Sequence, residues 1–284
     1  MERKNLFMRN EVAAVVVLFN PNERQTFDNI MTYVDCVDRL YIVDNGSDEV
    51  CESLKYIKNT EYIRLKKNMG IAYALNLALE KSSKSGYSWL LTMDQDSSFV
   101  HDSCRELVSN VQRHKNVNPN LSLFSANYHG KRISKDNFFK IITSGSIVKI
   151  SSAVKIGGWN NKLFLDGVDY DFALRLRGAG FEFEIREDIL LNHRIGTATD
   201  INFLFFKVKG FIHNPVRTYY CFRNGFYLIL THSPRNPKFG LSMAISMLRY
   251  LGKIIFSPNR FEHLKMIFRG FNDSRKGKFG EYNG

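Results

Sequence analysis

YSWLLTMDQDS, residues 87–97, joins an apolar run to an acidic end and decides the fold class. The run predicts a strand over 87–93 that leads straight into Asp94-Gln95-Asp96-Ser97. Two carboxylates one residue apart at a strand end can both approach one divalent cation. Hard oxygen ligands suit Mg²⁺ or Mn²⁺, which in turn bind phosphate oxygens. A solvated turn is the other interpretation, because acidic pairs are common in turns.

The chain before this stretch alternates short apolar runs with longer helical patterns. Strands are predicted over 13–19, 40–44 and 62–65, and helices near 24–37 and over 70–81. This alternation is typical of stacked βαβ units with a mostly parallel sheet. The first run, AAVVVLF, has no polar alternation, as expected of a strand that is covered on both faces.

Polar residues follow the predicted strands. Asn20 comes after the first strand, Asp44 and Asn45 come after the second, and the Asp94 and Asp96 pair comes after the fourth. In open α/β sheets, ligands bind at the carboxyl ends of the strands. The sequence therefore predicts a ligand site along this edge of the sheet.

A second acidic cluster, Asp166, Asp169 and Asp171, opens a helix predicted to begin near Gly167. Carboxylates at a helix start serve as caps or as favourable charges for the helix dipole. Alternatively, one of them is a general base that removes a proton from a hydroxyl nucleophile. The residues alone leave both roles open.

Four later residues have two interpretations each. His193 is either a satisfied polar residue or a ligand of a metal or phosphate. Arg217 and the Arg223-Asn224 pair either bind phosphate through a guanidinium fork or belong to an aromatic helix with solvated arginines.

The charge of this 284-residue chain is uneven. It has 40 basic and 28 acidic residues, and the segment from Ile201 to Gly284 holds 14 of the bases but only 3 of the acids. The segment also contains 17 of the 38 aromatic residues, and its helical patterns are basic and amphipathic. Such helices can lie in an anionic membrane interface. Single-stranded nucleic-acid binding is the alternative, but it explains neither acidic cluster, so no nucleic acid is expected.

The four cysteines, Cys36, Cys51, Cys104 and Cys221, are scattered and form no CxxC pair. Neither a zinc site nor a disulfide framework is indicated, which fits a reducing cytoplasm. The apolar run 12–19 is short for a signal peptide, and no stretch has the roughly 18 apolar residues of a membrane span. Any membrane contact is therefore expected at the surface.

Eight motifs occur in order between about residues 12 and 230: VLFNPN, VDNGS, KKNMGIAYALNLALE, LLTMDQDS, ITSGSIVKI, FLDGVDYDFALRLRGAGF, LNHRIG and VRTYYCFRNGFYL. Together they resemble the second family of glycosyltransferases, specifically its bacterial rhamnosyltransferase-like branch. The resemblance implies a GT-A fold, a Rossmann-like, mostly parallel central sheet flanked by helices. The implied glycosyltransferase domain covers 1–230, with a nucleotide-binding half at about 10–100 and an acceptor half at about 101–230. A basic amphipathic helical region, 231–284, follows.

The resemblance also implies roles for single residues. Those expected to bind the nucleotide sugar are Asn20, Asp44, Asn45, Asn68, Gly70, Asp94, Arg223 and Asn224. Those expected at the metal are Asp94, Asp96 and His193. Asp169 matches the family's catalytic base, with Asp171 beside it. Many relatives carry Glu-Asp where this chain has Val168-Asp169, so Asp171 and Asp166 remain alternatives for the base.

The implied reaction is inverting transfer of a sugar to a hydroxyl of a glycan or of a polyprenyl-diphosphate-linked acceptor, with Mg²⁺ or Mn²⁺. The expected donor is dTDP-rhamnose and the expected pathway is O-antigen or capsule synthesis. UDP-galactofuranose and UDP-glucose are the alternative donors. The implied location is the cytoplasm, peripherally at the inner face of the membrane, and the oligomeric state stays open.

Overall fold

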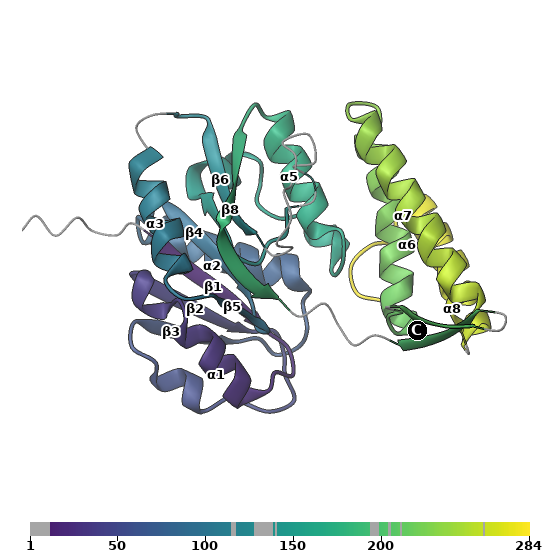
Figure 1. Cartoon of the computed structure of the whole chain (residues 1–284), viewed down its shortest axis with the longest axis horizontal. Helices are drawn as coiled ribbons and strands as arrows, with labels where there is room; N and C mark the ends of the chain where they lie inside the picture. Colours follow the sequence, from purple (N-terminus) through teal and green to yellow (C-terminus); the bar gives the residue numbers. More distant parts are fainter. Residues whose placement is uncertain are drawn as a thin grey trace, which may run out of the picture. The chain divides into compact units, whose positions relative to one another are not determined.

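The computed structural model describes residues 12–114, 118–127, 139, 141–193, 199–203, 206–210, 212–257 and 259–284. The chain forms two compact units (Figure 1). The first unit contains the chain up to Met69 together with Ala74–Gly158 and Arg175–His193. The second unit contains Gly70–Tyr73, Trp159–Leu174 and the chain from Arg194 onward.

The first unit is built on an eight-stranded sheet with the order β3-β2-β1-β4-β7-β6-β8-β5. Its first four strands are parallel: β1 (Val12–Leu18), β2 (Arg39–Asp44), β3 (Thr60–Arg64) and β4 (Trp89–Asp94). Each predicted strand of this half is confirmed to within about two residues. β1 is almost wholly buried, as its lack of polar alternation predicts.

The other half of the sheet is mixed. It consists of β5 (Ser97–Phe99), β6 (Leu121–Asn127), β7 (Ser146–Lys149) and β8 (Glu182–His193). β7 runs antiparallel to β4 and β6, β8 runs parallel to β6, and β5 runs antiparallel to β8. Because β6–β8 complete the same sheet as β1–β4, the compact units do not follow the halves at about 10–100 and 101–230. Those halves remain a prediction about which ligand each part binds.

Helices and short turns connect these strands: α1 (Glu23–Met31), a 3₁₀ turn (Val34–Cys36), a 3₁₀ turn (Ser53–Tyr56), α2 (Ile71–Lys84), α3 (Ser103–His114) and α4 (Ile150–Lys155). The Asn22 side chain caps α1 by accepting from the Gln25 N–H. α1 ends earlier than the predicted residue 37 because the Thr32 hydroxyl and N–H both return to the Asn29 carbonyl and close the helix. An apolar core including Leu91, Phe124 and Ile147 fills this unit.

The second unit is mainly helical. It contains a two-stranded ribbon, β9 (Thr199–Phe203) and β10 (Phe206–Gly210), then α6 (Pro215–His232), α7 (Pro237–Ile255) and α8 (Arg260–Arg275). The start of α5 (Val168–Gly178) and a 3₁₀ turn (Asn161–Leu163) also belong to it. α6 packs against both α7 and α8 (Figure 1). The basic aromatic C-terminal region is therefore helical, as predicted. Within the described part of the chain, no helix is long and apolar enough to cross a membrane.

Candidate functional site

The edge of the first unit's sheet begins at Asp44, the last residue of β2. Its side chain is fully buried and accepts hydrogen bonds from the Ser47 N–H at 2.8 Å and the Tyr62 hydroxyl at 2.9 Å. Arg64 adds an ion pair at 3.6 Å. Burial, followed by the bond to Asp44, raises the pKa of Tyr62 well above its ordinary value. Tyr62 therefore stays protonated and fixes the orientation of the carboxylate.

The predicted asparagines meet at the same edge. The Asn20 side chain exchanges hydrogen bonds with Asp48, and the backbone N–H of Asn20 donates to the Ser47 hydroxyl at 2.9 Å. The Asn45 amide donates to the Asn68 side chain at 3.0 Å and accepts from the Met69 N–H at 2.9 Å. The strand ends and the 66–69 loop are thus joined, as expected for neighbouring parallel strands.

Gly46 allows the 66–69 loop to lie close to the end of β2. Its φ is +82°, and a Cβ at this position would lie 2.3 Å from the carbonyl carbon of Lys67. Only a residue without a side chain allows that approach. Gly70, predicted beside the nucleotide, has a φ of +86° and belongs to the second unit. There a Cβ would collide with Phe164, and the neighbouring Ile71 N–H donates to the Phe164 carbonyl.

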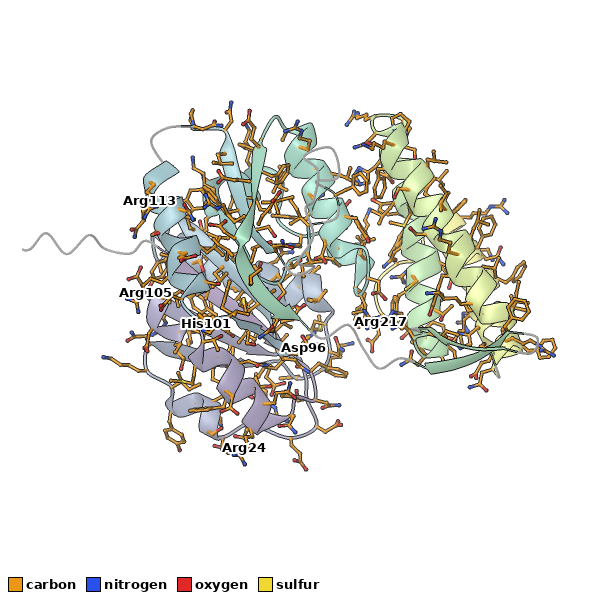
Figure 2. All side chains as sticks on the ribbon, viewed as in Figure 1. Arg24, Asp96, His101, Arg105, Arg113 and Arg217 are labelled. Carbon is orange, nitrogen blue, oxygen red and sulfur yellow. The ribbon has the colours of Figure 1, made fainter. Side chains whose placement is uncertain are left out.

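Asp94 is the last residue of β4 and Asp96, labelled in Figure 2, follows two residues later; both side chains are half-buried. Between them, Gln95 is bonded to the end of β1: its side-chain oxygen accepts from the Phe19 N–H at 2.8 Å. The Gln95 carbonyl accepts from Asn29 of α1 at 2.9 Å. These bonds fix the backbone that carries both carboxylates, so the predicted pair stands on a rigid strand end.

His193, the third predicted metal ligand, is the last residue of β8. The backbone register pairs it with Ser97, the residue that follows Asp96. The side chain of His193 lies outside the described part of the structure. Among the described side chains, no group of three His, Cys, Asp or Glu residues is arranged to hold a metal. The backbone pairing nonetheless places His193 opposite the residue that follows Asp96, and the carboxylate oxygens of Asp94 and Asp96 are ligands that suit Mg²⁺ or Mn²⁺.

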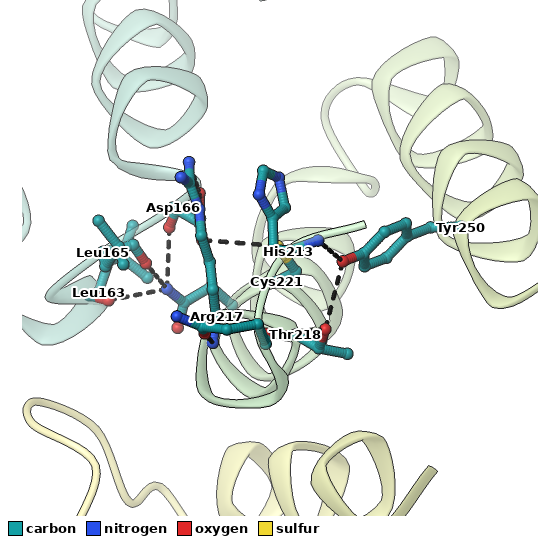
Figure 3. A network of polar contacts seen from close by, with 10 residues as sticks. Leu163, Leu165, Asp166, His213, Arg217, Thr218, Cys221 and Tyr250 are labelled. Atoms are coloured by element: carbon teal, nitrogen blue, oxygen red, sulfur yellow. Dashed lines mark hydrogen bonds and ion pairs between the residues drawn. The ribbon is translucent and has the colours of Figure 1, made fainter. Parts of the chain in front are cut away.

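The second acidic cluster separates into three different environments. Asp171 is buried and lies 3.0 Å from His232 Nε2. Both oxygens of Asp166 accept from Arg217 at 3.0–3.2 Å, and the Cys221 thiol lies 3.5 Å away (Figure 3). Asp169 is half-buried in the first turn of α5, at the positive end of the helix dipole. Burial therefore shields Asp171, and an arginine occupies Asp166.

The 163–167 loop, which leads into α5, has a strained backbone. Phe164 has φ +60° and ψ −61°, and the Leu165 N–H donates to the Leu163 carbonyl at 2.6 Å, which together form a γ-turn. Asp166 and Gly167 also have positive φ, at 57° and 79°. Such conformations persist only where the surrounding structure fixes them.

Asn224 fixes this loop. Its amide nitrogen lies 2.7 Å from the Leu163 carbonyl, 2.6 Å from that of Leu165 and 2.8 Å from that of Asp166. Arg223 is fully buried, and its Nε donates to the Asn224 side-chain oxygen at 2.9 Å, which orients the amide. The same guanidinium donates to the carbonyls of Leu163 at 3.1 Å and of Gly280 at 2.8 Å.

The donor contact predicted for Arg223 and Asn224 remains a prediction, and the structure gives both residues a local role that the sequence did not indicate. No sequence signal points to it, because the loop and the pair lie about 60 residues apart in the chain. Arg217 differs likewise from its sequence interpretation, since it pairs with Asp166.

A cavity of about 280 Å³ lies beside this loop within the second unit. Asp166 and Tyr170 line it from the start of α5, and Phe222, Met247 and Tyr250 line it from α6 and α7. Its wall is mainly apolar with a few polar groups at Asp166, His213 and Ser246, a composition typical of small-molecule sites. Figure 3 shows that the Tyr250 hydroxyl accepts from the His213 N–H, which fixes one wall.

Known proteins resemble both the sequence and the fold. The chain is 28% identical over 249 residues to the dTDP-rhamnosyl transferase RfbF of Shigella flexneri, covering 78% of this chain and 81% of that protein. The structure of S. aureus TarS 1–349 in complex with UDP-GlcNAc matches with a TM-score of 0.51 at 11% identity, covering 96% of this chain and 93% of that one. The complex with UDP gives the same TM-score and identity.

The family profile described as glycosyl transferase family 2 matches residues 22–168. This match spans more than half of the chain and runs from the first helix to the acidic start of α5. The sheet and its flanking helices are those of a GT-A fold. The chain therefore belongs to glycosyl transferase family 2 and is a glycosyltransferase.

Proposed function

We propose that this enzyme transfers rhamnose from dTDP-rhamnose, with inversion, to a hydroxyl of a glycan or lipid-linked acceptor in surface polysaccharide synthesis. The observation that carries the donor assignment is the similarity to the rhamnosyl transferase RfbF along four-fifths of that protein. UDP-galactofuranose and UDP-glucose are the competing donors.

The donor half of the proposal rests on the strand ends of the first unit. Asn20, Asp44, Asn45 and Asn68 form one hydrogen-bonded edge, and we assign the nucleotide to it. Asp94, Asp96 and His193 would hold Mg²⁺ or Mn²⁺, and the ion would supply positive charge beside the leaving diphosphate. A nucleoside diphosphate leaves without needing a protein acid.

The base in this proposal is Asp169. Asp171 is about 1% exposed and lies against His232, so an acceptor hydroxyl has no access to it. Both oxygens of the Asp166 carboxylate accept hydrogen bonds from Arg217, so this carboxylate already has a partner in the structure. Asp169 takes the hydroxyl proton as the oxygen attacks the anomeric carbon opposite the leaving group. One displacement inverts the configuration.

We assign the acceptor to the cavity of the second unit. Its aromatic walls at Tyr170 and Tyr250 suit the apolar face of a sugar ring, and Asp166 and Ser246 supply hydrogen-bonding groups. Tyr170 is the next residue after the proposed base. A polyprenyl-linked acceptor sits in a membrane, so we further propose that the enzyme works peripherally at the cytoplasmic membrane face.

The test is a donor panel. Purified protein with Mg²⁺ or Mn²⁺ is incubated with dTDP-rhamnose, UDP-galactofuranose and UDP-glucose, with and without a lipid-linked acceptor extract, and release of nucleoside diphosphate is measured. We expect release from dTDP-rhamnose that depends on the metal and on acceptor. Asp96→Ala should abolish release, whereas Asp169→Asn should abolish transfer but keep donor binding.

Two results would contradict the proposal. Release from a UDP-sugar but not from dTDP-rhamnose would show that the donor is a UDP-sugar. Turnover by Asp169→Asn would show that Asp169 is not the base. Asp102→Asn is the matched control, since it changes an aspartate of the first unit whose side chain is 85% exposed and lies 4.0 Å from Arg105.

A further inference from the structure

The outer face of α8 carries a row of exposed apolar side chains. Phe261 is 74% exposed and Phe268 is 69% exposed, and Leu264 lies between them. With 3.6 residues per turn, these three positions share one face of the helix. Ile255, the last residue of α7, is also exposed and precedes the short connection to α8. We call these four residues the apolar ridge.

The side chains of the apolar ridge stay exposed in the second unit. α8 packs through its opposite side, where His263 is buried and its Nδ1 lies 2.9 Å from the Thr218 hydroxyl of α6. Gly270 lies so close to α6 that a Cβ would sit 2.8 Å from the Tyr219 carbonyl. α7 likewise buries Ile254 rather than Ile255. Exposed rings of this size gathered on one ridge mark an interaction surface.

Basic residues flank the ridge. Arg260, Lys265 and Arg275 are exposed on α8, and Lys253 is exposed on the last turn of α7. From Arg235 to Gly284 the chain has ten basic and three acidic residues. Of the acids, Asp273 bonds the Tyr219 hydroxyl, and Glu262 follows Phe261 by about 100° around the helix, away from the row. An apolar strip with a basic margin therefore faces outward.

The basic residues beside the ridge indicate which partner it binds. A second copy would bring two like-charged margins together, which opposes association. An anionic bilayer offers hydrocarbon to the rings and negative headgroups to the margin, and both interactions are favourable at once. We propose that the apolar ridge inserts into the interface of an anionic membrane, with the flanking arginines and lysines on lipid phosphates. This inference rests on the proposed function in one respect, since a lipid-linked acceptor requires the enzyme at the membrane.

The test measures binding of the full-length chain to vesicles of phosphatidylcholine alone and of phosphatidylcholine with phosphatidylglycerol. We expect binding only to the anionic vesicles, weakening as salt rises. The double substitution Phe261→Asp with Phe268→Asp should reduce vesicle affinity about tenfold or more. Both side chains are exposed, so this variant should keep the wild-type melting temperature. Tyr56→Asp, which changes an 83% exposed aromatic residue of the first unit, is the matched control and should bind normally.

Three results would overturn the inference: no binding of the wild type to anionic vesicles at low salt, unchanged binding by the double variant, or a wild-type dimer that the double variant converts to monomer. A separate assay keeps the proposed function distinct. With detergent-solubilised acceptor, the double variant should release nucleoside diphosphate at the wild-type rate, and it should lose activity only on acceptor in vesicles. Loss of activity on both forms of the acceptor would show that the ridge is needed for catalysis itself and would contradict the membrane role.

Discussion

Replacement of Asn224 tests whether this residue holds the loop before α5 or touches the donor. Asn224→Ala removes the amide donor from three backbone carbonyls. The Leu163 carbonyl keeps Arg223 and the Leu165 N–H as donors, whereas those of Leu165 and Asp166 lose their side-chain partner. At about 1–3 kcal/mol for each of these two carbonyls left without its bond, we expect the free energy of unfolding to fall by about 2–6 kcal/mol.

The loop should then relax, because its positive φ values cost energy that the amide offsets. Relaxation moves the start of α5 and with it Asp169. A displacement of about 1 Å at a catalytic group costs on the order of a hundredfold in rate. We therefore expect kcat to fall by about 10- to 100-fold while the KM for the donor stays unchanged. Asn224→Asp should lower stability and kcat further, since a carboxylate oxygen would face the backbone carbonyl oxygens.

The assay combines urea denaturation with steady-state kinetics. Trp159 is buried in the second unit, where it stacks on Phe172, so its fluorescence in a Trp89→Phe background reports unfolding of that unit. Asn236→Ala is the control, because it removes only the capping bond to the Phe239 N–H and should cost about 1 kcal/mol with no effect on kcat. A raised donor KM with normal stability would refute the loop role and favour the predicted donor contact.

Three further predictions follow from single contacts. Gly46→Ala forces a Cβ to 2.3 Å from Lys67, so it should destabilise the first unit by about 1–3 kcal/mol in urea denaturation and raise the donor KM; wild-type values for both would contradict the close approach. Ser246→Trp adds a ring at the exposed rim of the cavity, so acceptor KM should rise while donor binding stays constant; an unchanged acceptor KM would place the acceptor elsewhere. Burial lowers the pKa of His263 below its ordinary 6.5, so the unfolded chain binds the proton more readily than the folded chain. The free energy of unfolding should therefore fall as pH drops through about 6.5. His263→Gln should flatten this pH dependence, and an unchanged slope in the variant would refute the assignment to His263.

The local pattern of apolar and polar residues was sufficient to predict the strands of the parallel half of the sheet. The apolar runs that became β1, β2 and β4 are continuous. β2 and β4 each end in an aspartate, and Asn20 follows β1 after one further residue, so the strands and their ends were both predictable from the sequence. The shorter α1 was not, because its end depends on the bonds that Thr32 makes to Asn29.

The sequence by itself determined which side chains stand at the strand ends, that a basic aromatic region follows residue 200, and, through its ordered motifs, the family. Only the tertiary structure separated the three aspartates at α5. The partners of two of them come from α6, 51 and 61 residues further along the chain: Arg217 pairs with Asp166 and His232 lies against Asp171. The same helix gives Asn224 to the loop before Asp169. Such partners are chosen by packing, and packing between distant segments leaves no periodic trace in the chain.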